Sequence, residues 1–373
     1  MVDPRLDRLA EILVRYSANV KTGDLVGITG LPFSAEALPL MEAVVREVLR
    51  AGGHPLPHLQ NRFIEGFNRI FYKEGSDAQL QYVEPWAEQM IRSLDCDIKI
   101  KAATNTRGLS TVDSSRIAIH NRSRADLFNL YLRRAAQGSL RWVLSVMPTP
   151  AYAQDAEMSL SEFADFVFAS TCADRDDPIA FWKKLSETQA SLVAKLADKR
   201  TVAVQSRNID LTFSVEDRTF INCDGKHNMP DGEIFTCPVE DTVNGWMESS
   251  FTAIYLGVDV GRVRMRFKDG RVVEAESEKN QDYLTAMLDT DEGAGRVGEF
   301  GIGTNEQINV FTKNMLFDEK IGGTIHLALG ASLPQAGGVN KSGIHWDFLC
   351  DMRDAGTITI DGKRVYEEGR FVI

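Results

Sequence analysis

Cysteine is scarce in this sequence, and its spacing matches no metal or redox motif. The five cysteines, an odd number with no C-x-x-C pair, are Cys96, Cys172, Cys223, Cys237 and Cys350. Their spacing argues against a thiolate zinc site and against a disulfide framework. We therefore expect free, buried thiols in a protein of a reducing compartment.

Long apolar runs are also missing. No stretch of about 18 apolar residues occurs, so we expect no membrane-spanning helix and no membrane partner. The opening segment MVDPRLDR lacks the apolar core of a signal peptide, and we expect a cytoplasmic protein. The net charge of −11 disfavours nucleic acid as a partner, because phosphates would be repelled.

Several common catalytic motifs are absent. The sequence contains no G-x-x-x-x-G-K-[ST], no H-E-x-x-H and no G-x-S-x-G. A P-loop nucleotidase, a zincin and an α/β-hydrolase of the usual type are therefore disfavoured. Gly301-Ile302-Gly303 lacks the third glycine of a dinucleotide fingerprint.

The pattern of apolar residues divides the 373-residue chain near position 200. Helical periodicity over 35–50, 123–137 and 177–199 alternates with short apolar runs, which predicts an N-terminal α/β domain with a mostly parallel sheet. Beyond Arg200, short strands follow one another, with Asp-Gly turns at 269–270 and 361–362. We expect a C-terminal α+β domain rich in antiparallel strands, and place the domains at 1–203 and 204–373.

Candidate metal ligands are few, because the sequence has only six histidines, His54, His58, His120, His227, His326 and His345. Pro55 and Pro57 prevent the helix that would put the first two on one face. His120 lies in a polar stretch and is expected at the surface. His227 follows a turn and is expected to be exposed.

The last two histidines have a different setting. His345 and Asp347 lie two apart in an apolar strand, so their side chains project from one face. Such a buried pair needs a partner, which could be a metal ion or simply a hydrogen bond between the two. His326 lies in the apolar run 323–330 and could be either a ligand or a hydrogen-bonded core residue.

Two glutamates share this apolar, glycine-containing setting. Glu233 lies in Asp-Gly-Glu-Ile-Phe and Glu299 in Gly-Glu-Phe-Gly, and each alone could equally face solvent at a strand end. Taken together, two Glu, two His and one Asp form an oxygen and nitrogen ligand set suited to zinc, cobalt or manganese.

Five ordered motifs in the C-terminal half and one near the N-terminus carry a family resemblance. The sequence resembles the M29 (aminopeptidase T/S) metallo-aminopeptidases over nearly its whole length. The motifs are YSANVKTGDLV (16–26), PDGEIFTCP (230–238), GEFGIGTN (298–305), NMLFDEK (314–320), IHLALG (325–330) and IHWD (344–347).

The resemblance implies a function and a set of site residues. It implies a homodimeric enzyme that removes N-terminal residues from peptides with two divalent cations, zinc, cobalt, manganese or magnesium. Either Asp347 or Glu233 is expected to bridge the two cations, and Glu299 is expected to carry a proton to the leaving amine. The substrate's α-amine would bind a cation or an acidic group such as Asp318 or Glu319. These two could equally be salt-bridge residues that support the metal ligands. The implied metal ligands are Glu233, Glu299, His326, His345 and Asp347.

One departure from the family keeps alternatives open. The family usually has a tyrosine before the proline that follows Ala-Leu-Gly, and here Leu333 takes its place. Leucine cannot donate a hydrogen bond to a developing oxyanion, so a catalytically weak metal-binding relative is one alternative. Another alternative is a ring-cleaving Fe(II) dioxygenase, because those enzymes resemble this protein in fold and keep the His-x-Asp pair. They carry histidine at the position of Glu299, so Glu299 disfavours this alternative.

Overall fold

The computed structural model describes residues 3–58 and 64–373. The chain forms two compact units. Unit 1 comprises Met1–Phe181 with Gly225–Pro230, and unit 2 comprises Trp182–Asp224 with Asp231–Ile373. The division falls inside helix α10 (Pro178–Leu196), whereas the predicted boundary at 203/204 falls inside strand β5 (Thr201–Ser206). The predicted boundary at 203/204 concerns domains that fold independently of each other. It stays a prediction.

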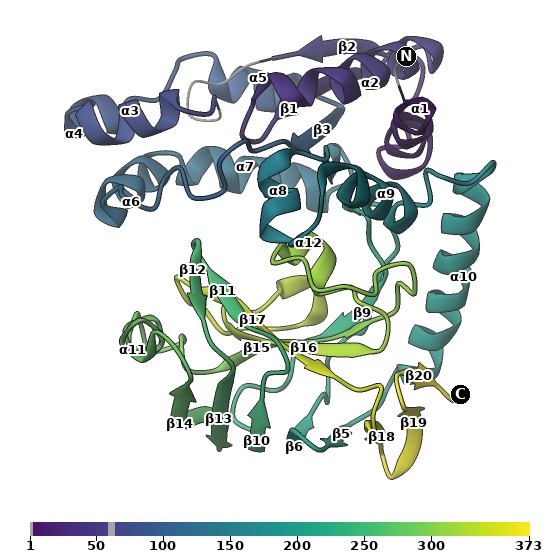
Figure 1. Cartoon of the computed structure of the whole chain (residues 1–373), viewed down its shortest axis with the longest axis vertical. Helices are drawn as coiled ribbons and strands as arrows, with labels where there is room; N and C mark the ends of the chain where they lie inside the picture. Colours follow the sequence, from purple (N-terminus) through teal and green to yellow (C-terminus); the bar gives the residue numbers. More distant parts are fainter. Residues whose placement is uncertain (1–2, 59–63) are drawn as a thin grey trace. The chain divides into compact units, whose positions relative to one another are not determined.

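A five-stranded parallel sheet forms the centre of unit 1 (Figure 1). Its order is β2-β1-β3-β4-β8, and every pairing is parallel. The last strand comes from the 225–230 segment, far along the chain from the other four. The strands are β1 (Leu25–Gly30), β2 (His54–Pro57), β3 (Cys96–Lys101), β4 (Arg141–Val146) and β8 (Asn228–Met229).

Helices follow or connect these strands, as the alternating pattern predicts. The predicted helix at 35–50 is present as η2 and α2, and its apolar residues Leu40, Val44 and Val48 are buried. The helical elements of unit 1 are α1 (Pro4–Glu11), η1 (Ile12–Ser17), η2 (Ala35–Ala37), α2 (Leu38–Arg50), α3 (Phe67–Glu74), α4 (Asp77–Gln81), α5 (Ala87–Ser93), α6 (Ser114–Ser123), α7 (Ala125–Ala136), α8 (Pro150–Asp155) and α9 (Leu160–Ser170).

The expectation that His120 lies at the surface is wrong. The side chain is 2% exposed, and its Nδ1 lies 3.0 Å from the carbonyl oxygen of Leu80 in α4. The polar sequence around His120 covers only the outer side of α6, while the imidazole faces the neighbouring helix. This contact is a structural hydrogen bond and does not belong to a metal site.

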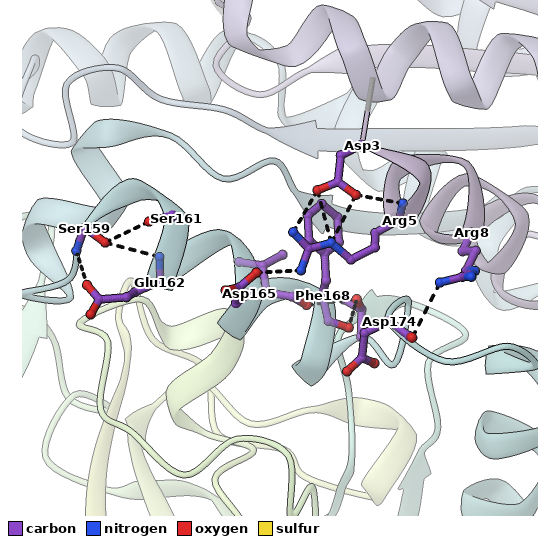
Figure 2. A network of polar contacts seen from close by, with 11 residues as sticks. Asp3, Arg5, Arg8, Ser159, Ser161, Glu162, Asp165, Phe168 and Asp174 are labelled. Carbon is purple, nitrogen blue, oxygen red and sulfur yellow. Dashed lines mark hydrogen bonds and ion pairs between the residues drawn. The ribbon is translucent and has the colours of Figure 1, made fainter. Parts of the chain in front are cut away.

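A polar network ties the first helix to α9 (Figure 2). The guanidinium of Arg5 donates to Asp3, which caps α1, and to Asp165 of α9 at 2.6 Å. The same guanidinium lies 4.4 Å from the ring centroid of Phe168. The network therefore fastens the N-terminal helix to α9 by charge and by ring contact together.

Unit 2 contains two larger antiparallel sheets and the hairpin β11-β12 (Figure 1). The eight-stranded sheet has the order β14-β13-β10-β6-β5-β18-β19-β20, and the five-stranded sheet β17-β16-β15-β9-β7. The predicted Asp-Gly turns are both present, with positive φ at each of their two residues, as type I′ hairpin turns require. The predicted fold class, α/β followed by an antiparallel-rich α+β region, is confirmed.

The elements of unit 2, besides α10 and β5, are β6 (Ile209–Ser214), β7 (Ile221–Cys223), β9 (Glu233–Thr236), β10 (Asn244–Glu248), β11 (Ala253–Tyr255), β12 (Val258–Val260), β13 (Val263–Lys268), β14 (Arg271–Ser277), α11 (Gln281–Leu288), β15 (Val297–Gly303), α12 (Met315–Asp318), β16 (Thr324–Gly330), η4 (Pro334–Ala336), β17 (His345–Asp351), β18 (Thr357–Ile360), β19 (Lys363–Glu367) and β20 (Arg370–Phe371).

The main core of unit 2 lies between its two larger sheets. Side chains such as Phe213 and Met265 from the eight-stranded sheet belong to one buried cluster with Phe300, Leu327 and Phe348 from the five-stranded sheet. Because side chains alternate along a strand, the residues between these apolar positions face the opposite side of the five-stranded sheet. That opposite face carries the candidate site.

Two expectations from composition can be compared with the structure. All five cysteines are free thiols, as predicted. Among the described residues, none of the helices combines the length and the apolar character that crossing a membrane requires.

Candidate metal centre

The five-stranded sheet gathers all five predicted ligands on one face. They come from four adjacent strands: Glu233 on β9, Glu299 on β15, His326 on β16, and His345 and Asp347 on β17. The register sets His326 opposite Gly301 and sets Asp347 opposite Ala328. Residues more than 100 positions apart in sequence are therefore brought together by strand pairing alone.

Glu299 occupies the middle of the cluster. Its Oε1 lies 3.5 Å from Nε2 of His326, and its Oε2 lies 3.2 Å from Nε2 of His345. Three groups of close potential ligand atoms occur among the described residues. Glu299 belongs to two of them, Glu233–Glu299–His326 and Glu299–His345–Asp347, and the third is Cys223–Asp231–Glu233. The remaining four histidines lie in unit 1 and belong to none of the ligand groups found in the described part of the chain.

A glycine makes room for the imidazole of His326. A Cβ added at Gly301 would lie 2.1 Å from Cε1 and 2.2 Å from Nε2 of that ring. The ring therefore lies across β15 at a place where no other residue type could stand without moving it. From there, Nε2 is also 3.6 Å from Oε2 of Glu233.

A backbone contact restricts the neutral imidazole of His345, the form that binds a metal, to one tautomer. Its Nδ1 lies 2.8 Å from the carbonyl oxygen of Ala331. A carbonyl can only accept, so Nδ1 carries the hydrogen and Nε2 is left to face the carboxylates. Metal-binding histidines are commonly oriented by such a bond from the other ring nitrogen.

The spacing of these atoms fits a divalent metal better than direct hydrogen bonds. The four imidazole–carboxylate distances run from 3.2 to 3.7 Å, longer than good N–H···O bonds. Two ligand atoms held about 2.1 Å from one tetrahedral ion lie about 3.4 Å apart. Within the described residues, Oε2 of Glu233, Nδ1 of His326 and Oδ1 of Asp347 are buried without a hydrogen bond. The donor set and its unsatisfied oxygens therefore suit divalent cations.

Burial and mutual charge shift the pKa values in the cluster. Burial raises the pKa of Glu233 to about 8 and that of Asp347 to about 6. Burial also opposes ionisation of Glu299, but the two neighbouring imidazoles outweigh it and lower its pKa to about 2. Burial opposes charge on His326 and His345 as well, yet Glu299 raises their pKa values to about 9 and about 10. The metal-free cluster thus holds protons that cations would displace.

The sequence did not identify two supporting residues. Lys320 is fully buried, with its Nζ paired to Glu319 and 3.7 Å from Oε1 of Glu233. Gln189 of α10 donates from Nε2 to the backbone oxygen of Glu233 at 2.8 Å. Lys320 is the last residue of the family motif 314–320, and no other feature of the sequence indicates that it supports the site. Gln189 had no signal, because its partners depend on how α10 packs against the sheet.

Leu333 lies beside the cluster, on a loop leading into η4. Its side chain packs, partly buried, against Phe235, Cys237 and Ala336. Phe235 and Glu233 lie two apart on β9 and share the site face. Leucine therefore presents an apolar surface next to the strand that supplies Glu233.

The fold and the site together define a class of protein with an α/β unit and a β-sandwich unit, in which the sheet face away from the sandwich core carries a mostly buried cluster suited to divalent cations. A family described as "Thermophilic metalloprotease (M29)" matches residues 2–371. The chain belongs to this family, as the resemblance predicted, and membership implies a divalent metal. The alternative of a ring-cleaving dioxygenase is not supported, because the match lies with the metalloproteases.

Characterised relatives align along nearly the whole chain. Aminopeptidase 2 of Geobacillus stearothermophilus is 28% identical over 410 residues, covering 97% of this chain and 96% of that protein. Aminopeptidase AmpS of Bacillus subtilis is 23% identical over 401 residues, covering 96% of each. The solved structure of wild-type AmpT from Thermus thermophilus has the same fold, with a TM-score of 0.83 at 21% identity and 99% coverage of both chains.

Proposed function

We propose that this chain is a metal-dependent aminopeptidase that hydrolyses the N-terminal peptide bond of peptides at a dinuclear site. The observation that carries the proposal is the pair of ligand groups that share Glu299. The names of the aligned relatives support the same activity. The proposed ligands of two divalent cations, zinc, cobalt, manganese or magnesium, are Glu233, Glu299, His326, His345 and Asp347.

The geometry favours a division of the ligands between two positions. Glu233 and His326 would hold one cation, and His345 and Asp347 the other. Each oxygen of Glu299 faces a different imidazole, so we propose Glu299 as the ligand common to both. When bound, a pair of divalent cations lowers the pKa of a water molecule and polarises the scissile carbonyl.

The shared position also bears on the proton transfer that the sequence predicts for Glu299. Each carboxylate oxygen of Glu299 faces an imidazole, so neither oxygen is left to accept a proton and pass it to the leaving amine. Its arrangement supports bridging more directly than proton transfer. In either role its carboxylate is essential to the proposed reaction.

Leu333 supports a second candidate, a metal-binding relative with weak peptidase activity. Its side chain lies against Phe235 and Cys237 and offers no hydroxyl at the site face. Loss of one oxyanion donor typically lowers the rate by about 10²- to 10³-fold. This candidate binds cations like the first but turns over peptides slowly.

We further propose that the protein is a cytoplasmic homodimer. Free thiols suit a reducing compartment. Unit 1 exposes the aromatic side chains of Phe67, Tyr82, Trp86 and Phe128, which lie on or next to α3, α4, α5 and α7. Exposed aromatic side chains are enriched at protein interfaces. Light scattering across a concentration series tests the dimer, and mutation of Trp86 and Phe128 to serine should favour the monomer.

The function is tested by reconstitution. The protein is freed of metal by chelation and assayed with aminoacyl p-nitroanilides and short peptides after addition of Zn²⁺, Co²⁺, Mn²⁺ or Mg²⁺. We expect no activity without metal, recovery with at least one cation, and no cleavage of N-acetylated peptides. Elemental analysis should give about two ions per chain. Failure of every cation to restore cleavage of any peptide would refute the aminopeptidase assignment.

A further inference from the structure

A fully buried lysine organises the carboxylates behind the ligand cluster. Lys320 has no exposed surface, and its Nζ pairs with Oε1 of Glu319 while lying 3.7 Å from Oε1 of Glu233. A buried ammonium is stable only with such compensation. Lys320 therefore links one proposed metal ligand to one carboxylate, Glu319, that belongs to neither of the two groups sharing Glu299.

Of the two adjacent acidic residues at the end of α12, only Glu319 has exposed side-chain surface. Asp318 is fully buried, and its Oδ1 accepts from the backbone N–H of Thr312 at 2.7 Å and from the Thr312 hydroxyl at 2.8 Å. These bonds hold the turn that precedes α12. One oxygen of Asp318 is thus committed to the local fold. Its Oδ2 is buried without a hydrogen bond among the described residues, and the side chain has no exposed surface at which a substrate could reach it.

Glu319 is the accessible carboxylate of this region. Its side chain is 19% exposed, against 7% for Glu233, 6% for Glu299 and 10% for Asp347. The described contacts engage its Oε1 with Lys320 and none involves Oε2. Glu319 shares Lys320 with Glu233, so its carboxylate lies near one of the proposed ligands.

We propose that Glu319 binds the α-ammonium group of the peptide substrate and that Lys320 is the positioning residue that holds it there. The inference rests on the proposed aminopeptidase function, since such an enzyme must recognise a free N-terminus. An α-amino group is largely protonated at neutral pH. A carboxylate with one oxygen anchored by a lysine and the other open can accept a charge-assisted hydrogen bond from that group.

The test compares two small inert probes that differ only in the amine. These are 3-methylbutylamine, which carries an ammonium group, and 3-methylbutan-1-ol, which is neutral. Each is measured as a competitive inhibitor of aminoacyl p-nitroanilide hydrolysis by the wild-type, Glu319→Gln and Glu276→Gln proteins. Glu276, exposed on β14 of the other sheet, is the matched control.

We expect the wild-type and Glu276→Gln proteins to prefer the amine over the alcohol by roughly tenfold or more. Glu319→Gln should bring that ratio close to one and raise KM more than it lowers kcat. The ratio is measured on folded molecules alone, so partial unfolding of the variant does not change it. An amine preference that persists in Glu319→Gln would place the amine elsewhere, for instance on a cation, and overturn the proposal. Absence of hydrolysis in the wild type with every cation would instead refute the function on which it rests.

Discussion

The two faces of the five-stranded sheet in unit 2 use the same strands for opposite purposes. Along β15, Phe300 and Ile302 point into the main core and are fully buried. Their neighbours Glu299 and Gly301 point to the other face, where one is a proposed ligand and the other makes room for an imidazole. Because side chains alternate along a strand, residues that stabilise the core and residues that form the candidate site are adjacent in the same segment.

The two faces also differ in the size of their residues. The core face is filled by large apolar side chains, as the interior of a sandwich requires. The site face has Gly301, Gly303 and Ala328 between its charged residues. These small residues leave room for rings and carboxylates that strand pairing brings from other strands. A substitution on this face should disturb the site before it disturbs the fold.

The largest contrast is expected between neighbouring substitutions on opposite faces, Glu299→Gln and Phe300→Ala. Glu299→Gln should lower kcat/KM by roughly a thousandfold or more, because it removes the carboxylate shared by both ligand groups. The chain should stay folded, since the two imidazoles can lose their protons once the carboxylate is gone. Activity with saturating metal and urea unfolding measure the two effects.

Phe300→Ala should show the reverse. Deleting a fully buried phenylalanine typically costs about 3–5 kcal/mol of unfolding free energy. Activity per folded molecule should fall far less than in Glu299→Gln. If Phe300→Ala were as stable as the wild type, or if Glu299→Gln unfolded the chain, the separation of roles between the faces would be wrong.

A smaller effect is expected from adding one methyl group at Gly301. The new Cβ would stand about where the His326 ring now lies, so Gly301→Ala should displace the imidazole. Metal affinity should fall by roughly 10- to 100-fold, the usual result of disturbing a ligand's support. Titration of metal-free protein with Zn²⁺ measures it. Gly295→Ala is the control, since a Cβ there meets nothing within 4 Å; equal affinity in both variants would contradict the steric reading.

Periodicity and motifs predicted most of the fold and the five ligand candidates. The strand spacing of His345 and Asp347 placed both on one face, and the structure agrees. The position of Glu299 between the two imidazoles could not be predicted, because it depends on the register of β15 against β16 and on the bulge between Val297 and Glu299. Register across strands is a property of the assembled sheet and leaves little mark on a single sequence.

Residues whose partners come from other elements were missed or misplaced. Lys320 looks like an ordinary surface lysine after two acidic residues, yet it is fully buried. His120 has polar neighbours in sequence but an apolar environment in space, including a ring contact with Phe71 at 5.2 Å between centroids. Both errors have one cause, since helix and loop packing decides burial where periodicity is weak.

The charge on the site face predicts how metal binding depends on pH. The pKa values of His326 and His345 are raised to about 9 and about 10 in the metal-free cluster, so both imidazoles hold protons at neutral pH. A cation must displace them, and the apparent metal affinity should therefore rise with pH, by about tenfold or more per unit between pH 6 and 8, and level off above about pH 10. Calorimetry in two buffers counts the protons released, and His345→Gln should release about one fewer. A metal affinity independent of pH would contradict the assignment of protons to these two imidazoles.

The smallest effect, and the only expected gain, concerns Leu333 at the edge of the site face. Leu333→Tyr restores a hydroxyl where the family usually has one, and should raise kcat by up to about tenfold through a donor to the developing oxyanion. Leu333→Phe adds the same ring without the hydroxyl, so it shares any cost of crowding Phe235 and Cys237. The difference in kcat between the two variants isolates the hydroxyl, with KM as a check on substrate fit. Equal rates would mean that the side chain at position 333 contributes only apolar surface beside Glu233. Slow turnover of the wild-type protein would then originate in the ligand cluster itself.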